Sequence, residues 1–222
     1  MNTLSFSLTG AMLCAMPSGA LWWPEWRLLC VSDLHLGKSE RIARRGGGLL
    51  PPYDSRDTLS RLDAEIARLD PATVVCLGDS FDDLAAAEAL EQEARAWLTR
   101  LIAGRAWVWI EGNHDPGPLA LDGSHRAELR IGGLCFRHVA AQGAQPGEVS
   151  GHYHPKACLG GGGRRVRRPC FLTDGERLIL PAFGTFTGGL DITAPELRAL
   201  MGPGARAILT GPTPVVFPAV AG

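Results

Sequence analysis

The chain has 222 residues, of which 45% are hydrophobic and 20% are charged, and its net charge at pH 7 is −1. This length suits one domain over residues 1–222 that buries its own core, and the composition excludes a disordered chain. The near-neutral net charge by itself indicates no class of partner. The charges are nevertheless unevenly placed, with basic residues gathered at 38–45 and 164–168 and acidic residues at 79–93.

The six cysteines form no C-x-x-C pair, and several of them lie inside apolar runs, so we expect free thiols rather than a zinc ribbon or a redox motif. The first 19 residues lack a positively charged start and contain Pro17 and Gly19. They predict a strand and a turn, not a signal peptide. The sequence has no apolar stretch of membrane-spanning length, and we expect a bacterial cytoplasmic protein.

Three apolar runs end in charged or imidazole side chains and predict buried strands: "RLLCVSDLHLG", "ATVVCLGDSFDD" and "AWVWIEGNHD". The first and second runs are separated by residues 54–70, whose leucines and isoleucine recur at helical spacing behind Asp54 as the expected N-cap. The second and third are separated by an Ala-rich stretch, 83–104, that predicts a helix closed by Gly104. This alternation indicates crossover units and parallel strand pairing.

After Gly117 the pattern changes to short strands. "AELRIGGLCFRHV" predicts a hairpin with a Gly-Gly turn, "CFLTDGERLIL" a hairpin around Asp174–Gly175, and "RAILTGPTPVVF" a last strand pair. The predicted fold class is therefore a layered α/β protein, with mixed β-sheets flanked by helices. We expect its functional site at the carboxyl ends of the strands, as in other open α/β sheets.

Polar residues of metal-binding type cluster at these strand ends, and five of the six histidines lie in or beside them. Residues i and i+2 of an extended stretch point to the same side, so Asp33/His35 and His152/His154 each predict a two-pronged metal claw. Carboxylate, amide oxygen and imidazole together suit Mn, Fe, Zn or Ni. The residues in question are Asp33, His35, Asp79, Asp82, Asn113, His114, Asp115, His138, His152 and His154.

These motifs resemble, in order, those of the calcineurin-like metallophosphoesterases: D-L-H at 33–35, G-D-x-x-D at 78–82, G-N-H-D at 112–115, one downstream His, and G-H-x-H at 151–154. The match covers about the first three-quarters of the chain. Three longer stretches are similar to the bacterial ligase-associated DNA-damage-response metallophosphoesterases: "DLHLGKSERIARRG", "GHYHPKACL" and "LILPAFGTFTGGL". That family is described as Mn-dependent endonucleases on single-stranded DNA. The resemblance also implies association with a DNA ligase, a helicase and an exonuclease of the same repair pathway.

The resemblance implies two divalent metal ions, most often Mn, with Fe, Zn, Ni or Co as alternatives. One would be held by Asp33, His35, Asp79 and His154, and the other by Asp79, Asn113, His138 and His152, with Asp79 bridging. His125 competes with His138 as the isolated ligand, and we prefer His138 because it closes a strand.

The resemblance also implies catalytic roles for the G-N-H-D motif. Asn113 would stabilise charge on the phosphate. His114 would protonate the departing oxygen, and Asp115 would orient His114 through its other ring nitrogen. Asp82 is expected to support a ligand, and Asp83 to cap a helix.

Two basic sets flank the claws, and each has a plain interpretation as a solvated surface and another as a track for a phosphate backbone. The sets are Lys38, Arg41, Arg44 and Arg45 after the first claw, and Arg164, Arg165, Arg167 and Arg168 on a Gly-rich loop after the second. Aromatic residues placed to stack on bases are Tyr53, Tyr153, Phe183 and Phe186. We favour a phosphodiesterase acting on single-stranded DNA. The alternatives are a hydrolase of small or lipid-linked diphosphates and, less favoured because every expected ligand is present, a non-catalytic scaffold of the same fold.

Overall fold

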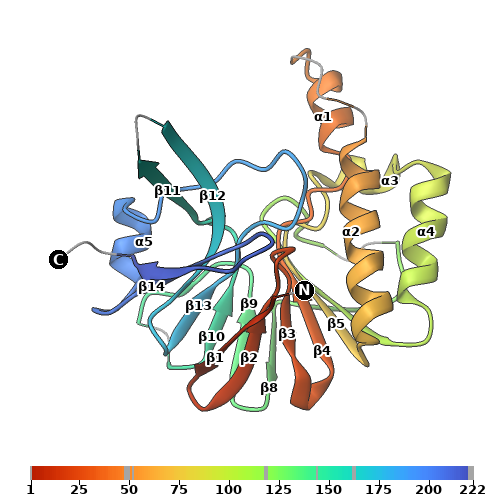
Figure 1. Cartoon of the computed structure of the whole chain (residues 1–222). Coiled ribbons are helices and arrows are strands. Elements are labelled where there is room, and N and C mark those ends of the chain that lie inside the picture. Colours follow the sequence, from red (N-terminus) through yellow and green to blue (C-terminus); the bar gives the residue numbers. More distant parts are fainter. Residues whose placement is uncertain are drawn as a thin grey trace.

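A computed structural model describes residues 2–47, 51, 53–117, 120–143, 145–161 and 164–219, and the side chains at positions 161, 164 and 165 lie outside this description. Two β-sheets pack face to face in the centre of the molecule (Figure 1). Helices α2 (Asp54–Leu69) and α4 (Gln92–Ile102) cover the outer face of the first sheet, and α5 (Pro195–Leu200) covers that of the second. This arrangement confirms the predicted layered α/β class.

The first sheet has the order β1-β2-β3-β4-β5-β6-β7, antiparallel from β1 to β4 and parallel from β4 to β7. The three apolar runs expected to be strands are the neighbouring parallel strands β4, β5 and β6, so their carboxyl ends lie at one edge. The N-terminal residues form strands and a turn, as predicted, and the two strands β1 and β2 pair as a hairpin. The strands are β1 (Leu4–Leu8), β2 (Ala11–Ala15), β3 (Leu21–Trp23), β4 (Leu28–Val31), β5 (Thr73–Leu77), β6 (Ala106–Ile110) and β7 (Ser124–Arg126).

The second sheet has the order β15-β14-β12-β13-β10-β9-β8, and β11 (Lys156–Gly161) pairs with β12 outside this path. The three predicted strand pairs are present as β8–β9, β12–β13 and β14–β15. The remaining strands are β8 (Glu128–Ile131), β9 (Leu134–Arg137), β10 (Glu148–Ser150), β12 (Arg164–Thr173), β13 (Arg177–Ile179), β14 (Arg206–Leu209) and β15 (Val216–Pro218).

The predicted helix over 54–70 is α2, but Asp54 is not its N-cap. The helix begins at Asp54, and the buried Asp54 carboxylate accepts bonds from the backbone N–H and hydroxyl of Ser39 in α1 (Lys38–Arg44), at 3.0 and 2.5 Å. Asp54 therefore fastens α1 to α2. The short 3₁₀ turn η1 (Pro24–Trp26) joins β3 to β4.

The single helix expected over 83–104 is wrong, because two helices occupy this stretch: α3 (Leu84–Glu88) and α4. Asp83 caps α3, as expected, by accepting the Ala86 N–H at 2.7 Å. The Arg95 guanidinium donates hydrogen bonds to the carbonyl oxygens of Ala87 and Glu88, at 2.7 and 3.3 Å. In a continuous helix these carbonyls would accept backbone N–H groups instead. Side-chain competition therefore accompanies the break between the two helices.

Apolar side chains of both sheets fill the space between them. Cys30, Val75 and Ile110 of the first sheet meet Phe136 and Phe171 of the second, and all five are essentially buried. Burying a large apolar side chain contributes about 1.5–3 kcal/mol to folding, so this core holds the strand ends in place. No helix in the described part of the chain combines the length and apolarity needed to cross a bilayer.

Candidate metal centre

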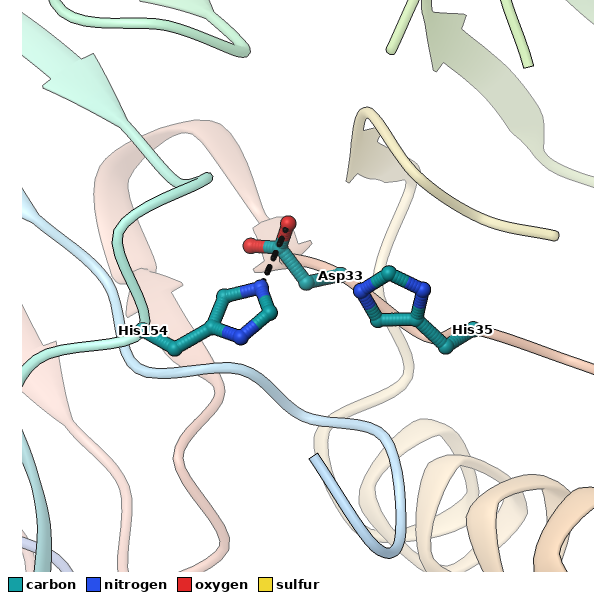
Figure 2. A group of neighbouring side chains, drawn as sticks. All are labelled: Asp33, His35 and His154. Carbon is teal, nitrogen blue, oxygen red and sulfur yellow. Dashed lines mark ion pairs between the residues drawn. The ribbon is translucent and has the colours of Figure 1, made fainter. Parts of the chain in front are cut away.

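Asp33 and His35 follow the end of β4, and His154 lies in the loop between β10 and β11; these three side chains converge (Figure 2). His154 Nε2 lies 3.0 Å from Asp33 Oδ1, and each residue offers a ligand atom within 4.8 Å of the other two. His35 Nε2 is buried without a hydrogen-bond partner, and Asp33 Oδ1 and His154 Nε2 are buried with no partner outside the group. Buried polar atoms without partners are rare in proteins, and a cation at this point would satisfy these atoms together.

A second group joins Asp79, His138 and His152, from the ends of β5, β9 and β10. His138 Nε2 lies 3.3 Å from Asp79 Oδ2, 3.3 Å from His152 Nδ1 and 2.9 Å from Asn113 Oδ1. The other ring nitrogen, Nδ1, lies 3.0 Å from the carbonyl oxygen of Leu77. An Nδ1–H bond to that carbonyl directs Nε2 toward the group, which is how metal-binding histidines are usually held.

The two groups are neighbours, because His138 touches both. Its Nδ1 lies 3.9 Å from Asp33 Oδ1, while its Nε2 faces Asp79. Burial alone would lower the pKa of His138, but the bond to Asp79 and the charges of Asp33 and Asp79 raise that pKa to about 9. Burial would raise the pKa of the Asp79 carboxyl, but the hydrogen bond and the charge of His138 outweigh burial and lower that pKa. The paired carboxylates thus concentrate negative charge, which draws a positive charge to the site.

The backbone at these residues is left-handed, not extended. The φ angles are +53° at Asp33, +45° at His35, +46° at Asp79, +67° at His152 and +47° at His154. The explanation of the claws by extended-strand alternation is therefore wrong, since β4 ends before Asp33 and β10 before His152. Left-handed backbone is uncommon outside glycine and clusters at functional sites, and Asp and His adopt it more readily than most residues. The presence of Asp and His at these positions was the only signal in the sequence for left-handed backbone.

Two glycines permit the close approach of these loops. A Cβ at Gly78 would lie 2.3 Å from His138 Nδ1, and one at Gly112 would lie 2.2 Å from the backbone nitrogen of Asp79. Either contact would push a side chain or loop of the second group out of place. The glycines of the G-D and G-N motifs are thus explained by packing.

The model of the calcineurin-like phosphoesterase family matches residues 27–180. The chain belongs to the calcineurin-like phosphoesterases. Among solved structures, the crystal structure of the nuclease MPE of Pseudomonas putida is similar to it, with 31% sequence identity and a TM-score of 0.76; the match covers 96% of this chain and 100% of that chain. No curated protein matches the sequence. The chain is therefore a hydrolase of a family that uses divalent metal ions, and the Asp and His groups at this edge of its sheets are suited to hold them.

Asp115 of the phosphoesterase does not orient His114, and that prediction is wrong. The buried Asp115 carboxylate accepts backbone N–H bonds from Asp79 (3.0 Å), Ser80 (2.8 Å), Phe81 (3.2 Å) and Gly112 (3.1 Å). Burial and the charge of Asp79 raise the pKa of Asp115 to about 6, although the backbone hydrogen bonds act to lower it. Asp115 thus holds the loop that carries Asp79.

His114 is oriented by a carbonyl instead. Its Nδ1 lies 2.8 Å from the backbone oxygen of Asp82, while its Nε2 lies 4.0 Å from Asp79 Oδ2, on the side of the second group. The His114 backbone N–H also donates to Asp79 Oδ1 at 2.8 Å. The imidazole therefore faces the second group with its Nε2, while a backbone carbonyl holds its Nδ1.

Asp82 supports His35, in agreement with its expected supporting role. Its Oδ1 lies 2.9 Å from His35 Nδ1, and its Oδ2 lies 2.5 Å from Arg41 Nη1. Burial would raise the pKa of Asp82, but His35 and Arg41 together lower it to about 2. Sequence reasoning missed a further support, the Ser32 hydroxyl, which donates to Asp33 Oδ2.

The first basic set lies on and beside α1, next to the centre, but part of its charge is paired within the protein. Arg41 pairs with Asp82, and Arg44 pairs with Asp83 at 3.0 Å. Arg45 is more exposed and lies 4.0 Å from Asp83. The positive charge of Lys38 helps to lower the pKa of Asp82. Lys38 and Arg45 therefore keep more of their charge available than the two paired arginines.

The second basic set lies on a β-hairpin, so the expected Gly-rich loop is wrong. The four positions belong to β12, paired antiparallel with β11. Arg167 donates to the Gly189 carbonyl at 3.2 Å, whereas the Arg168 guanidinium lies near Gly211. Adjacent strand residues face opposite sides, so these two arginines do not serve one surface. The side chains of Arg164 and Arg165 lie outside the described part of the chain.

His125, the competitor for the isolated ligand, lies elsewhere. It belongs to β7 and stacks on Trp109, with ring centroids 6.4 Å apart. Burial lowers its pKa. The structure thus places His138, and not His125, with Asp79 and His152.

Proposed function

We propose that this phosphoesterase is a binuclear phosphodiesterase, and specifically an Mn-dependent endonuclease that cuts single-stranded DNA in a repair pathway. One observation carries the proposal. Two His/Asp groups share an edge of the sheets and touch through His138, and the first group contains a buried nitrogen, His35 Nε2, with no hydrogen-bond partner. Paired sites of this kind suit in-line displacement at phosphorus.

Asp33, His35 and His154 would hold one cation, and His138, His152 and Asn113 the other, with Asp79 serving both. Cations there would polarise a phosphoryl oxygen and lower the pKa of a water molecule. The chain's own groups would do the rest. Asn113 and nearby cationic side chains would stabilise charge on the equatorial oxygens, and His114 would give a proton from Nε2 to the departing oxygen. The carbonyl of Asp82 would keep the His114 ring in place throughout.

Two features support a nucleic acid over a small diphosphate. The similar Pseudomonas putida protein is a nuclease. Cationic side chains on α1 and on the β11–β12 hairpin border the centre, and these two elements extend at the same end of the molecule (Figure 1). A long polyanion can use both of them, whereas a small diphosphate would reach only the centre. We propose association with a ligase, a helicase and an exonuclease on the basis of the sequence resemblance alone.

The bridge tests the proposal. Asp79→Ala should lower the bound Mn measured by elemental analysis and abolish cleavage of a single-stranded oligonucleotide. Asp83→Ala is a matched control, since this acid caps α3 without joining either group. The control should keep its metal and its activity. Full Mn content and turnover in Asp79→Ala would refute the two-metal centre, and a metal-loaded parent that cleaves no oligonucleotide would refute the substrate.

A further inference from the structure

Two aromatic rings lie in contact on the surface beside the metal centre. Tyr53, just before α2, and Phe186, in the segment after β13, have ring centroids 5.7 Å apart. Their exposed fractions are 54% and 40%, although rings of this size usually bury most of their area. Of the other aromatic candidates, Phe183 is buried and Tyr153 packs against the core under α5. Among these four, only Tyr53 and Phe186 are exposed, since Tyr153 is partly buried.

The chain holds Phe186 in this position against a local cost. Its φ angle is +59°, which is unusual for a bulky residue and costs free energy unless the surroundings impose it. The surroundings do impose it. Thr185, the preceding residue, accepts a bond from Arg61 at 3.0 Å, donates to Asp57 at 2.5 Å, and bonds through its backbone N–H to Thr58 at 3.1 Å. An exposed ring on a fixed, strained backbone points to a binding role.

The segment that carries Phe186 is built against the metal ligands. The Gly184 N–H donates to the carbonyl of Asp33 at 3.0 Å, and a Cβ at Gly189 would lie 2.1 Å from the carbonyl oxygen of His154. Phe186 is two residues from Gly184, so their Cα atoms lie within about 7 Å of each other. The Phe186 backbone therefore lies within about 7 Å of a residue that is hydrogen-bonded to the proposed ligand Asp33.

Cationic side chains surround the same segment. Lys156 Nζ donates to the carbonyl of Thr187 at 2.8 Å, and Arg167 donates to that of Gly189 at 3.2 Å. Lys38 lies between Gly37 and Ser39, whose backbone N–H groups donate to Ser55 at 2.8 Å and to Asp54 at 3.0 Å, so it lies beside the start of α2, next to Tyr53. Elements α1, β11 and β12 thus each bring one cation to the edge of the aromatic pair.

We propose that Tyr53 and Phe186 form a stacking platform for one unpaired base of the nucleic acid, next to the phosphate that is cut, while Lys38, Lys156 and Arg167 hold the adjoining backbone. This inference rests on the proposed nuclease function and deepens it. Aromatic faces beside a cationic track are the combination that binds single strands, because any base can stack on a ring. In a duplex, neighbouring base pairs cover the base faces. The platform therefore selects for single-stranded substrate.

The experiment removes the ring and the bases separately. The kcat/KM of the Mn-loaded protein is measured on a single-stranded oligonucleotide and on a strand of equal length that carries abasic residues throughout, so the backbone charge is the same. A stacked base contributes roughly 5- to 150-fold, and the parent should prefer the base-bearing strand by a factor in this range, mainly through KM. Phe186→Leu, which keeps an apolar side chain but has no aromatic face, should lose most of this preference. Tyr53→Leu should lose part of it.

Trp26→Leu provides the matched control. Trp26 is 42% exposed but precedes the start of β4, whereas the metal ligand Asp33 follows its end. Its replacement should leave the preference for bases unchanged. If Phe186→Leu keeps the parent's preference, or if the parent cuts both strands equally, the platform is refuted even though the protein is a nuclease, and the rings then face a different partner. A metal-loaded parent that cuts neither strand refutes the proposed function itself.

Discussion

Asp115→Asn tests whether Asp115 supports the Asp79 loop or the His114 ring. In the native protein one carboxylate oxygen accepts the N–H groups of Asp79 and Gly112, and the other accepts those of Ser80 and Phe81. The Asn side chain has the same shape but only one acceptor oxygen. One pair of buried N–H groups would then face an amide NH₂ group, which is itself a donor.

A buried donor left without an acceptor costs about 1–3 kcal/mol, so two of them should lower the free energy of unfolding by about 2–6 kcal/mol. That is a large part of the roughly 5–15 kcal/mol that stabilises a typical domain. With a urea m-value of about 2–3 kcal/mol/M for a chain of this size, the unfolding midpoint should fall by roughly 0.7–3 M.

Equilibrium urea unfolding followed by tryptophan fluorescence measures this shift, since Trp107 and Trp109 are buried. Asp83→Asn is the control, because Asn caps helices about as well as Asp and the midpoint should move little. If Asp115→Asn unfolds with the parent's midpoint and yet loses as much activity as His114→Ala, then Asp115 acts through the imidazole and our assignment fails.

Three further predictions concern chemistry, binding and protons. His114→Ala should cut single-stranded DNA roughly 10²–10⁴-fold more slowly and lose less on bis-(p-nitrophenyl) phosphate, whose leaving group needs no proton; equal losses would indicate a binding role. Arg167→Gln should lower the slope of log K against log salt for single-stranded DNA by about 0.7, whereas Arg168→Gln, on the other side of the hairpin, should keep the parent's slope. Because the pKa of His138 is raised to about 9, Mn binding at neutral pH must displace a proton, so calorimetry should detect proton release and an affinity that weakens as pH falls; an affinity independent of pH would contradict the assignment of His138 as a ligand.

Much of the local structure could be predicted from the sequence, because it depends on neighbours along the chain. Apolar runs ending in polar residues predicted β4, β5 and β6, and Gly-Gly and Asp-Gly turns predicted two hairpins. The motif order led to the family, since each motif is a short local pattern. Local patterns failed where a distant or competing side chain intervened, as Arg95 does at the break between α3 and α4.

The tertiary structure decided which of these residues meet, because the sheet order brings together strand ends that are far apart in the chain. Asp33 accepts the backbone N–H of His152 from 119 positions away, and no local pattern encodes that contact. The same holds for Asp115, whose carboxylate serves the β5 loop rather than its sequence neighbour. Five of the seven proposed ligands lie on left-handed backbone, a conformation imposed by packing and not by the preferences of the residues themselves.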